Sequence, residues 1–511
     1  MLDKLPTEIL NMTLSYVTSH KDLKQVCEVC TRLRDCAIPC LYQCLVFNDP
    51  EATYRESAAA VKSIPRRYAS HIRDIELRVP IHYRNCYHEM DDDYVWLDED
   101  DAFDTEDSLF DYFEYMEDEL EREIEDGIEV KNADDRFLDD QLRTFRWNMG
   151  MCIPNMILSS NGFSLLRKQK KIRSLILYTD AYCHESVGSV DLAQFQDLRS
   201  LCWKGLNKYS DFECLKDCIR AHGHQLLSLT LDLVNWDHAK NRWTHEFCRQ
   251  SDEGMPNNFF VQRIMNAKVG NERIVMQSLE YLDLSAISFE HADAEVPFLF
   301  NAENLRSLKL RKCLGSLNLL ELASSSGKWT ELKYFELVLT NSGPTTTTKI
   351  ICNFIHSAPK LETLCLMLRE PINRETLIST IRRCSCLKRL VMHSLADERN
   401  PVLGGEEHKV NQLQGLQARP SCKLLHIRAT GTAMIDPLYH PLDIYEFAEW
   451  AFSAEGLPDL THNSLFCRSK TGYRRLDESE ISLWDLVNDN MDMLAACPYT
   501  DTNVLSRTDF L

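Results

Sequence analysis

A short apolar motif recurs along the body of the chain. It reads L-x-x-L-x-L, in which another apolar residue can replace Leu, and this alternation predicts a short β-strand in each copy. Most copies begin 26 to 29 residues after the previous one. A gap of 53 residues, close to two periods, predicts that one repeat near 235–275 is degenerate or replaced by an insertion. The copies begin at Ile172, Leu198, Leu226, Leu279, Leu305, Leu332, Leu361, Leu387 and, more weakly, Cys422.

Helical patterns lie between several of these predicted strands. One strand and one helix per period is typical of the long leucine-rich repeat, whose units bury their apolar faces only by stacking. The sequence therefore predicts an α/β fold, with a leucine-rich-repeat solenoid of curved parallel sheet and outer helices over residues 141–430. An ordinary α/β domain is the alternative. The helical patterns comprise Phe212, Leu215 and Ile219; Ile350, Ile351, Phe354 and Ile355; and Leu377, Ile378, Ile381 and Cys384.

Two regions flank this predicted solenoid. A connecting segment, 49–88, holds one irregular copy of the motif, Ile72-Arg-Asp-Ile75-Glu-Leu77. Residues 431–511 break the period and are expected to cap the array, because a terminal repeat exposes an apolar face. Two helices are predicted in this cap, one through Ile444, Phe447, Ala448 and Ala451 and one through Ile481, Trp484, Leu486 and Met491.

The first 48 residues show a different, helical pattern. Pro6 suits the first turn of a helix, and Leu10, Leu14 and Val17 follow on one face. Ser19 and Asp22 fit a capping box that starts a second helix, which Pro39 is expected to bound. The second apolar stripe contains Leu23, Val26, Cys27, Cys30 and Leu33. Two or three short helices cannot bury both stripes internally, so they either pack on the following domain or bind a partner.

This N-terminal pattern resembles the F-box family. The matching elements are Leu5-Pro6-Thr7-Glu8-Ile9-Leu10, Asp22-Leu23, Val29-Cys30-Thr31-Arg32 and Leu41-Tyr42, in the family's order and spacing. Leu33 and Tyr42 stand where the family often has Trp. The resemblance implies docking on the Skp-type adaptor of a cullin–RING ubiquitin ligase; a helical cap on the following domain is the alternative. The expected adaptor-binding residues are Leu5, Pro6, Ile9, Leu10, Leu14, Val17, Leu23, Val26, Cys30, Leu33 and Leu41.

Charge is concentrated in one segment. The chain carries a net charge of −21, yet residues 89–140 alone hold 25 acidic residues against three basic ones, so the remaining body is balanced. Low hydrophobicity and like-charge repulsion predict a mobile acidic insertion. Without a basic excess, binding to nucleic acid is not expected. Six basic residues at the second position of the motif form a possible dock for the acidic insertion; a solvated loop without contacts is the alternative. The six are Arg173, Arg199, Arg306, Lys333, Lys388 and Lys423.

Several other classes of protein are disfavoured. No stretch approaches the roughly 20 apolar residues of a membrane span, and no secretory signal is visible at the start. Twenty cysteines without such a signal favour the cytosol or the nucleus. Cys27 and Cys30 lie inside a helical pattern, so core packing is expected rather than zinc binding. Phosphate-loop, zinc-protease and serine-hydrolase motifs are missing, so neither an enzyme nor a cofactor is expected.

The predicted sheet offers a second binding surface. Side chains that flank the buried positions of each strand point to the concave face, and their mixture of aromatic residues, arginine and other charges favours protein binding. The hypothesis is a non-catalytic substrate receptor of an SCF-type ubiquitin ligase, and the alternative is a leucine-rich-repeat scaffold outside any ligase. The candidate target-binding residues are Tyr281, Asp283, Lys309, Arg311, Tyr334, Glu336, Arg389, His393, His426 and Arg428.

Overall fold

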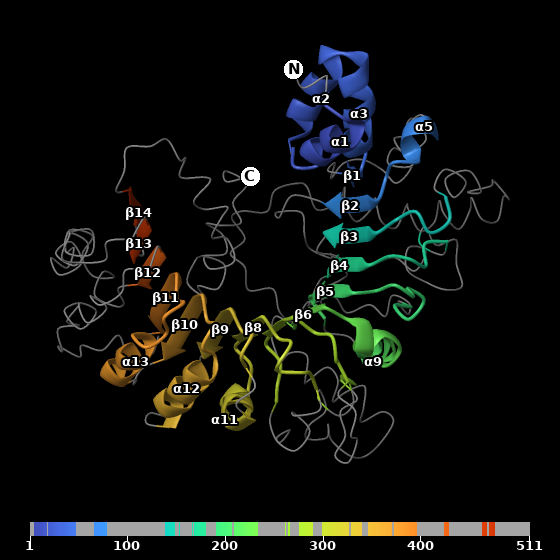
Figure 1. Ribbon diagram of the computed structural model, residues 1–511. Helices are drawn as coiled ribbons and strands as arrows, with labels where there is room; N and C mark the ends of the chain where they lie inside the picture. The colour runs from blue at the N-terminus through green and yellow to red at the C-terminus, as the bar shows by residue number, and fades with distance from the viewer. Residues whose placement is uncertain are drawn as a thin grey trace, which may run out of the picture. The chain divides into compact units, whose positions relative to one another are not determined.

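The protein is described by a computed structural model. It groups into two compact units, residues 1–222 and 223–511, each of which is described by itself (Figure 1). The described residues are 5–17, 19–47, 66–78, 138–148, 153, 166, 168–179, 191–206, 209–233, 261, 264–265, 275–289, 299–326, 329–339, 346–369, 373–395, 424–428, 462–467 and 470–475.

The first unit begins with three helices and continues into a parallel sheet. The helices are α1 (Thr7–Leu14), α2 (His20–Val29) and α3 (Thr31–Leu41). Five strands follow in chain order, each hydrogen-bonded in parallel to the next where the pairing is described. They are β1 (Cys44–Phe47), β2 (Asp74–Arg78), β3 (Thr144–Asn148), β4 (Ser174–Tyr178) and β5 (Ser200–Lys204); α5 (Arg66–Ala69) precedes β2 and α9 (Tyr209–His222) follows β5.

The second unit continues the same alternation of strands and helices. Its strands β6 to β13 are parallel and lie in chain order, and β14 pairs antiparallel with β13. The strands are β6 (Ser228–Asp232), β7 (Tyr281–Ser285), β8 (Ser307–Arg311), β9 (Tyr334–Leu339), β10 (Thr363–Arg369), β11 (Arg389–Leu395), β12 (Leu424–Arg428), β13 (His462–Cys467) and β14 (Lys470–Arg475). The helical elements are η4 (Gly223–Gln225), α11 (Ser316–Ser326), α12 (Thr346–Ser357) and α13 (Arg374–Ile381), and the last three lie on one face of the sheet (Figure 1).

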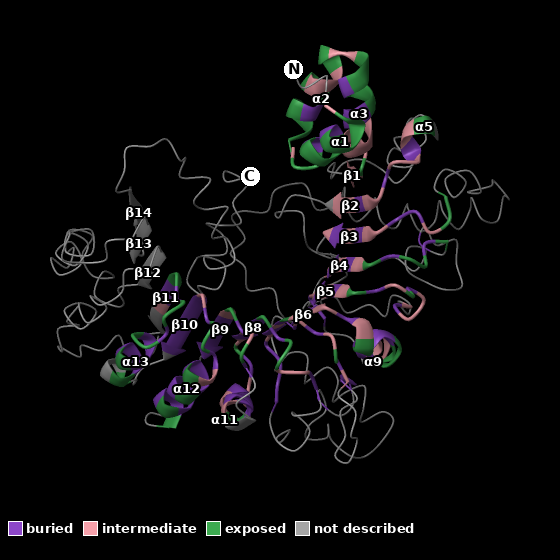
Figure 2. Ribbon diagram, viewed as in Figure 1, coloured by how far each residue is buried: buried purple, intermediate pink, exposed green. Residues whose placement is uncertain are grey.

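Burial alternates along β3 to β7 as the motif predicts, whereas β9 and β10 are buried at nearly every position. In β4, β5 and β6 the second and fourth residues are buried, and the residues between them are half-buried. The buried positions of these three strands carry apolar residues of the motif, Trp203 in β5 and Leu at the others, whose removal from water stabilises each strand on its neighbours. Figure 2 shows the consequence, since buried residues follow the strands and the sheet-facing sides of α12 and α13. Each unit is therefore an α/β, solenoid-like arrangement.

Every predicted copy of the motif forms a strand, and three predicted helices are present as α9, α12 and α13. The gap of 53 residues contains an insertion, because β6 pairs directly with β7. The sequence analysis did not predict several elements that the structure contains, namely β1, β3, β13, β14 and α11. The predicted cap helices, the acidic residues 89–137 and Lys423 lie outside the described residues.

The N-terminal helices differ from the prediction in two respects. The predicted second helix is divided in two, because Cys30 is extended, with φ −161° and ψ 164°, between α2 and α3. Pro39 does not bound a helix; it lies inside α3, close to its end. Among the described residues, no helix has the length and apolarity needed to cross a membrane.

Candidate functional site

The three N-terminal helices enclose a small core of their own. Leu10, Leu14, Leu23 and Leu33 are buried in it, together with Cys36. Four of the sequence-predicted adaptor-binding residues therefore already contact each other inside the module. Of the others, Pro6 and Ile9 are exposed. The remaining five, Leu5, Val17, Val26, Cys30 and Leu41, are partly buried against this core.

Short polar contacts fix the helices that enclose this core. The Ser19 hydroxyl accepts a hydrogen bond from the backbone N–H of Asp22 at 3.2 Å, which caps α2 as the sequence predicted. The Cys30 Sγ accepts one from the N–H of Leu33 at 3.5 Å and so caps α3. The Arg32 guanidinium donates to the carbonyl oxygen of Leu5 at 2.6 Å, which ties α3 to the start of α1.

The outer side of α1 carries a second line of apolar residues. Ile9 is 40% exposed, Met12 is 55% exposed and Tyr16, just after the helix, is 80% exposed. Their spacing of three and four residues places them on one helical face, away from the face of Leu10 and Leu14. We call these three residues the exposed α1 stripe. Sequence reasoning singled out only Ile9, although the spacing of Met12 and Tyr16 was visible in the sequence.

The cysteines of this module pack as apolar groups. Burial raises the pKa of the Cys27 thiol and of the Cys40 thiol above the ordinary value, which opposes the thiolate form that binds zinc. In the part of the chain that the structure describes, no group of three or more His, Cys, Asp or Glu side chains could hold a metal ion.

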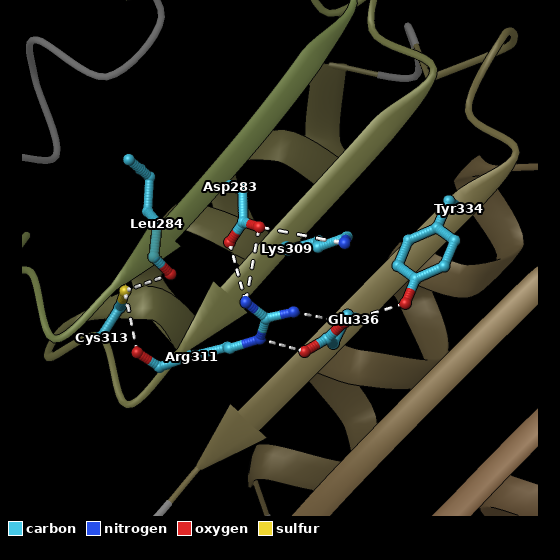
Figure 3. A network of polar contacts seen from close by, with 7 residues as sticks. All are labelled: Asp283, Leu284, Lys309, Arg311, Cys313, Tyr334 and Glu336. Atoms are coloured by element: carbon cyan, nitrogen blue, oxygen red, sulfur yellow. Dashed lines mark hydrogen bonds and ion pairs between the residues drawn. The ribbon is translucent and has the colours of Figure 1, made fainter. Parts of the chain in front are cut away.

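In the second unit, charged side chains of β7, β8 and β9 meet on the sheet face opposite α11 and α12 (Figure 3). The register places Asp283, Lys309 and Glu336 side by side on adjacent strands. Arg311 lies two residues beyond Lys309 and reaches both carboxylates. Its Nη1 donates to Asp283 Oδ1 at 3.3 Å, its Nη2 donates to Glu336 Oε2 at 3.2 Å, and its Nε also bonds Glu336.

Tyr334 and Lys309 complete this arrangement. The Tyr334 hydroxyl donates to Glu336 Oε2 at 2.9 Å, and Lys309 Nζ lies 3.9 Å from Asp283 Oδ2. The same ammonium group lies 5.0 Å from the centre of the Tyr334 ring, within the range of a cation–π interaction. We call Asp283, Lys309, Arg311, Tyr334 and Glu336 the charged network. It contains two carboxylates and two cations, so its formal charges cancel.

Burial and the neighbouring carboxylates together shift the pKa of Arg311 and of Tyr334 in the charged network. Glu336 is 0% exposed, and the other members are half-buried. Burial alone opposes the charged form of Arg311, but the carboxylates of Glu336 and Asp283 together raise the pKa of Arg311 above its ordinary value. Burial and the Glu336 carboxylate raise the pKa of Tyr334, which keeps its hydroxyl protonated as a donor. A fixed, internally paired network of this kind stabilises the sheet.

The other predicted target-binding residues are not members of the charged network. Tyr281, on β7, is 47% exposed, and Arg389, at the start of β11, is also exposed. His393 lies on β11, and His426 and Arg428 lie on β12. The predicted surface thus divides into a self-paired centre, in which Glu336 is buried, and exposed residues such as Tyr281.

A comparison with protein families agrees with the N-terminal geometry. Residues 2–48 match the family model described as F-box-like, and this range contains α1, α2, α3 and β1. No curated protein matches the chain. The N-terminal module is an F-box-like domain, and such a domain suggests an adaptor-binding role in SCF-type complexes, which generally involve a Skp-type adaptor.

Proposed function

We propose that this chain is the substrate-receptor subunit of an SCF-type ubiquitin ligase. Its F-box-like domain would dock on a Skp-type adaptor, and through it on a cullin, while the repeat sheet would bind a target protein. The observation that carries this proposal is the exposed α1 stripe on a module whose core is already formed. Supporting it, the F-box-like match covers the whole of α1.

An apolar face on both sides of α1 indicates two partners for this helix. One face packs on α2 and α3, and the other leaves Ile9, Met12 and Tyr16 in water. Contiguous exposed apolar groups are unfavourable in a monomer and are typical of interaction sites. Residues at i, i+3 and i+7 are the anchors with which an amphipathic helix enters an apolar groove. A groove on the adaptor would therefore cover the exposed α1 stripe.

For the target side, the proposal is that the strands are leucine-rich repeats and that the exposed residues of the second unit contact the target. Tyr281 is the best anchor because it is aromatic and half-exposed beside the rigid charged network. The receptor would perform no chemistry itself. It would act in the cytosol or the nucleus by holding the target near the ligase's charged conjugating enzyme, which raises the effective concentration of the reactants.

Co-purification with the Skp-type adaptor tests the docking step. Full-length protein with Ile9→Asp and Met12→Asp should lose adaptor binding by about a hundredfold or more, since buried carboxylates at an interface cost several kcal/mol. Its thermal unfolding should remain close to that of the natural chain, because both side chains are exposed in the free protein.

A matched control lies on the other flank of the same helix. Asn11 is exposed and polar, so Asn11→Asp adds the same charge outside the exposed α1 stripe and should leave adaptor binding unchanged. Undiminished binding by the Ile9→Asp, Met12→Asp protein would exclude the stripe as the interface. Failure of the natural chain to bind the adaptor would favour a repeat scaffold outside any ligase.

A further inference from the structure

Four arginines line up across the sheet of the first unit. Arg73, Arg143, Arg173 and Arg199 each come immediately before a strand, β2, β3, β4 and β5 respectively, and we call them the arginine row. Their backbones are directly linked, because the N–H of each donates to the carbonyl oxygen of the previous one at 2.6, 2.8 and 2.9 Å. With neighbouring strands about 4.8 Å apart, the row spans roughly 14 Å.

The described contacts of the arginine row leave its positive charge uncompensated. The Arg73 guanidinium donates to the carbonyl oxygens of Ser70 and Ile72, and Arg143 donates to that of Lys171. Arg173 and Arg199 are exposed. Within the described residues of this unit, no carboxylate forms an ion pair with any of the four. Like charges on neighbouring strands repel each other, so the row favours a bound anion.

In the second unit, the residues immediately before the strands include both acidic and basic side chains. There the row reads Glu280, Arg306, Lys333, Glu362 and Lys388, before β7 to β11. Arg306 pairs with Glu280 at 3.1 Å, and Glu362 pairs with Lys333 at 3.4 Å and with Lys388 at 2.7 Å. Three of the six basic residues of the sequence-predicted dock therefore already have carboxylate partners, while the first unit adds Arg73 and Arg143 to Arg173 and Arg199.

The acidic residues 89–137, which we call the acidic segment, lie in the connection that runs from the end of β2 to Arg143, the second member of the arginine row. β2 ends at Arg78 and β3 begins at Thr144, so the connection between them contains residues 89–137. Its described end already contacts this region. Asp140 Oδ2 lies 3.4 Å from Lys171 Nζ, and the N–H of Asp140 donates to the carbonyl oxygen of Lys168 at 2.9 Å.

We propose that the acidic segment, residues 89–137, binds the arginine row of its own chain through its carboxylates. Two observations support this proposal: a row of arginines without described carboxylate partners, and a polyacidic segment whose C-terminal side leads through Asp140 to Arg143 of the row. The tether gives the segment an effective concentration on the order of millimolar, so it competes strongly with any free anion.

A labelled peptide with the sequence of residues 89–137 tests the proposal by fluorescence anisotropy. It is titrated with the natural full-length chain and with a full-length neutralised chain, in which every Asp and Glu of residues 89–137 is replaced by Asn or Gln. The neutralised chain should bind the peptide at least about tenfold more tightly, because its row is vacated. Adding Arg143→Gln, Arg173→Gln and Arg199→Gln to the neutralised chain should weaken this binding about tenfold.

Two controls separate charge from folding. In the neutralised chain, Arg173→Lys and Arg199→Lys keep the charge, so affinity should stay within about threefold. Arg306→Gln, Lys333→Gln and Lys388→Gln remove the paired cations of the second unit and should change affinity by less than about twofold. Equal affinity of the natural and neutralised chains would overturn self-binding. Full affinity after the three Arg→Gln substitutions would overturn the assignment to the arginine row.

Discussion

The N-terminal helical module and the β7–β9 region of the second unit depart in opposite ways from the rule that apolar groups are inside and charges outside. The module leaves Ile9, Met12 and Tyr16 in water. The β7–β9 region takes the carboxylate of Glu336 out of water and places Arg311 against it. Each departure has an energetic cost, but only one of them is compensated by residues that the structure describes.

The difference shows how to read each surface. The charges in the β7–β9 region have their partners within the sheet, so the charged network is compensated without another molecule. The exposed apolar groups of α1 have no comparable described partner, which is why we propose that another molecule covers them. In this protein, a structural cluster is therefore distinguished from a candidate binding surface by whether its side chains find partners within the described chain, and not by residue type.

The largest expected effect comes from placing a charge in the apolar core of the helical module. Leu10 is buried against Leu14, Leu23 and Leu33, so Leu10→Asp would place an unpaired carboxylate in an apolar core at a cost of several kcal/mol. We expect loss of the helical module's fold and, with it, loss of adaptor binding. Circular dichroism of the full-length chain would show reduced helix content. Unchanged helix content together with lost binding would instead place Leu10 at the interface.

The next effect concerns the charged network. Glu336→Ala should lower the free energy of unfolding by about 3–5 kcal/mol, because it leaves Arg311 partly buried with fewer counter-charges. Urea denaturation measures this loss. Replacing both partners, with Arg311→Met and Glu336→Leu, should recover most of it, since a packed apolar pair replaces the buried ion pair. A loss below about 1 kcal/mol in Glu336→Ala would contradict the structural role of the network.

The smallest effect is expected at an exposed pair of the second unit. Lys388 Nζ donates to Glu362 Oε2 at 2.7 Å, and this hydrogen bond lowers the pKa of Glu362 below its ordinary value. Because solvent screens the pair, Lys388→Ala should lower the free energy of unfolding by only about 0–1 kcal/mol at neutral pH. Urea denaturation at several pH values measures the difference between the two proteins.

The pH dependence of this small effect has a defined sign. The folded-state pKa of Glu362 lies below its unfolded value, so its stabilising contribution is present above the unfolded pKa. The contribution is lost as the pH falls through the folded-state pKa, and the natural chain and the Lys388→Ala protein should then converge. A difference that grows on acidification would contradict this assignment.

Much of the fold could be predicted from the sequence because the repeat motif is nearly periodic. Each Leu-rich copy became a strand, but β3 was missed although Leu142, Phe145 and Trp147 fit the same motif, in which another apolar residue can replace Leu. The division of α2 from α3 was also missed. It depends on the extended backbone of Cys30 and on its side-chain cap, which apolar spacing does not encode.

The candidate sites were predictable as positions but not as contacts. Alternation along a strand indicates that Asp283, Arg311 and Glu336 share a face, whereas their pairing depends on the register between strands that are 25 to 28 residues apart in the sequence. Likewise, the second-position basic residues looked uniform in the sequence. Only the pairing of the strands shows the difference between them. Arg306 lies beside the carboxylate of Glu280, whereas the neighbours of Arg173 on the adjacent strands are arginines.

The bridging position of Arg311 has a consequence for how the second unit comes apart. In a stack of repeats each unit touches only its neighbours, so an array can unravel from an end one repeat at a time. Arg311, on β8, bonds a carboxylate of β7 and a carboxylate of β9. Releasing either outer strand therefore leaves the Arg311 guanidinium without one of its two carboxylate partners. These three strands should therefore open in one cooperative step, with their amide hydrogens exchanging at a common rate, while the repeats beyond them fray separately.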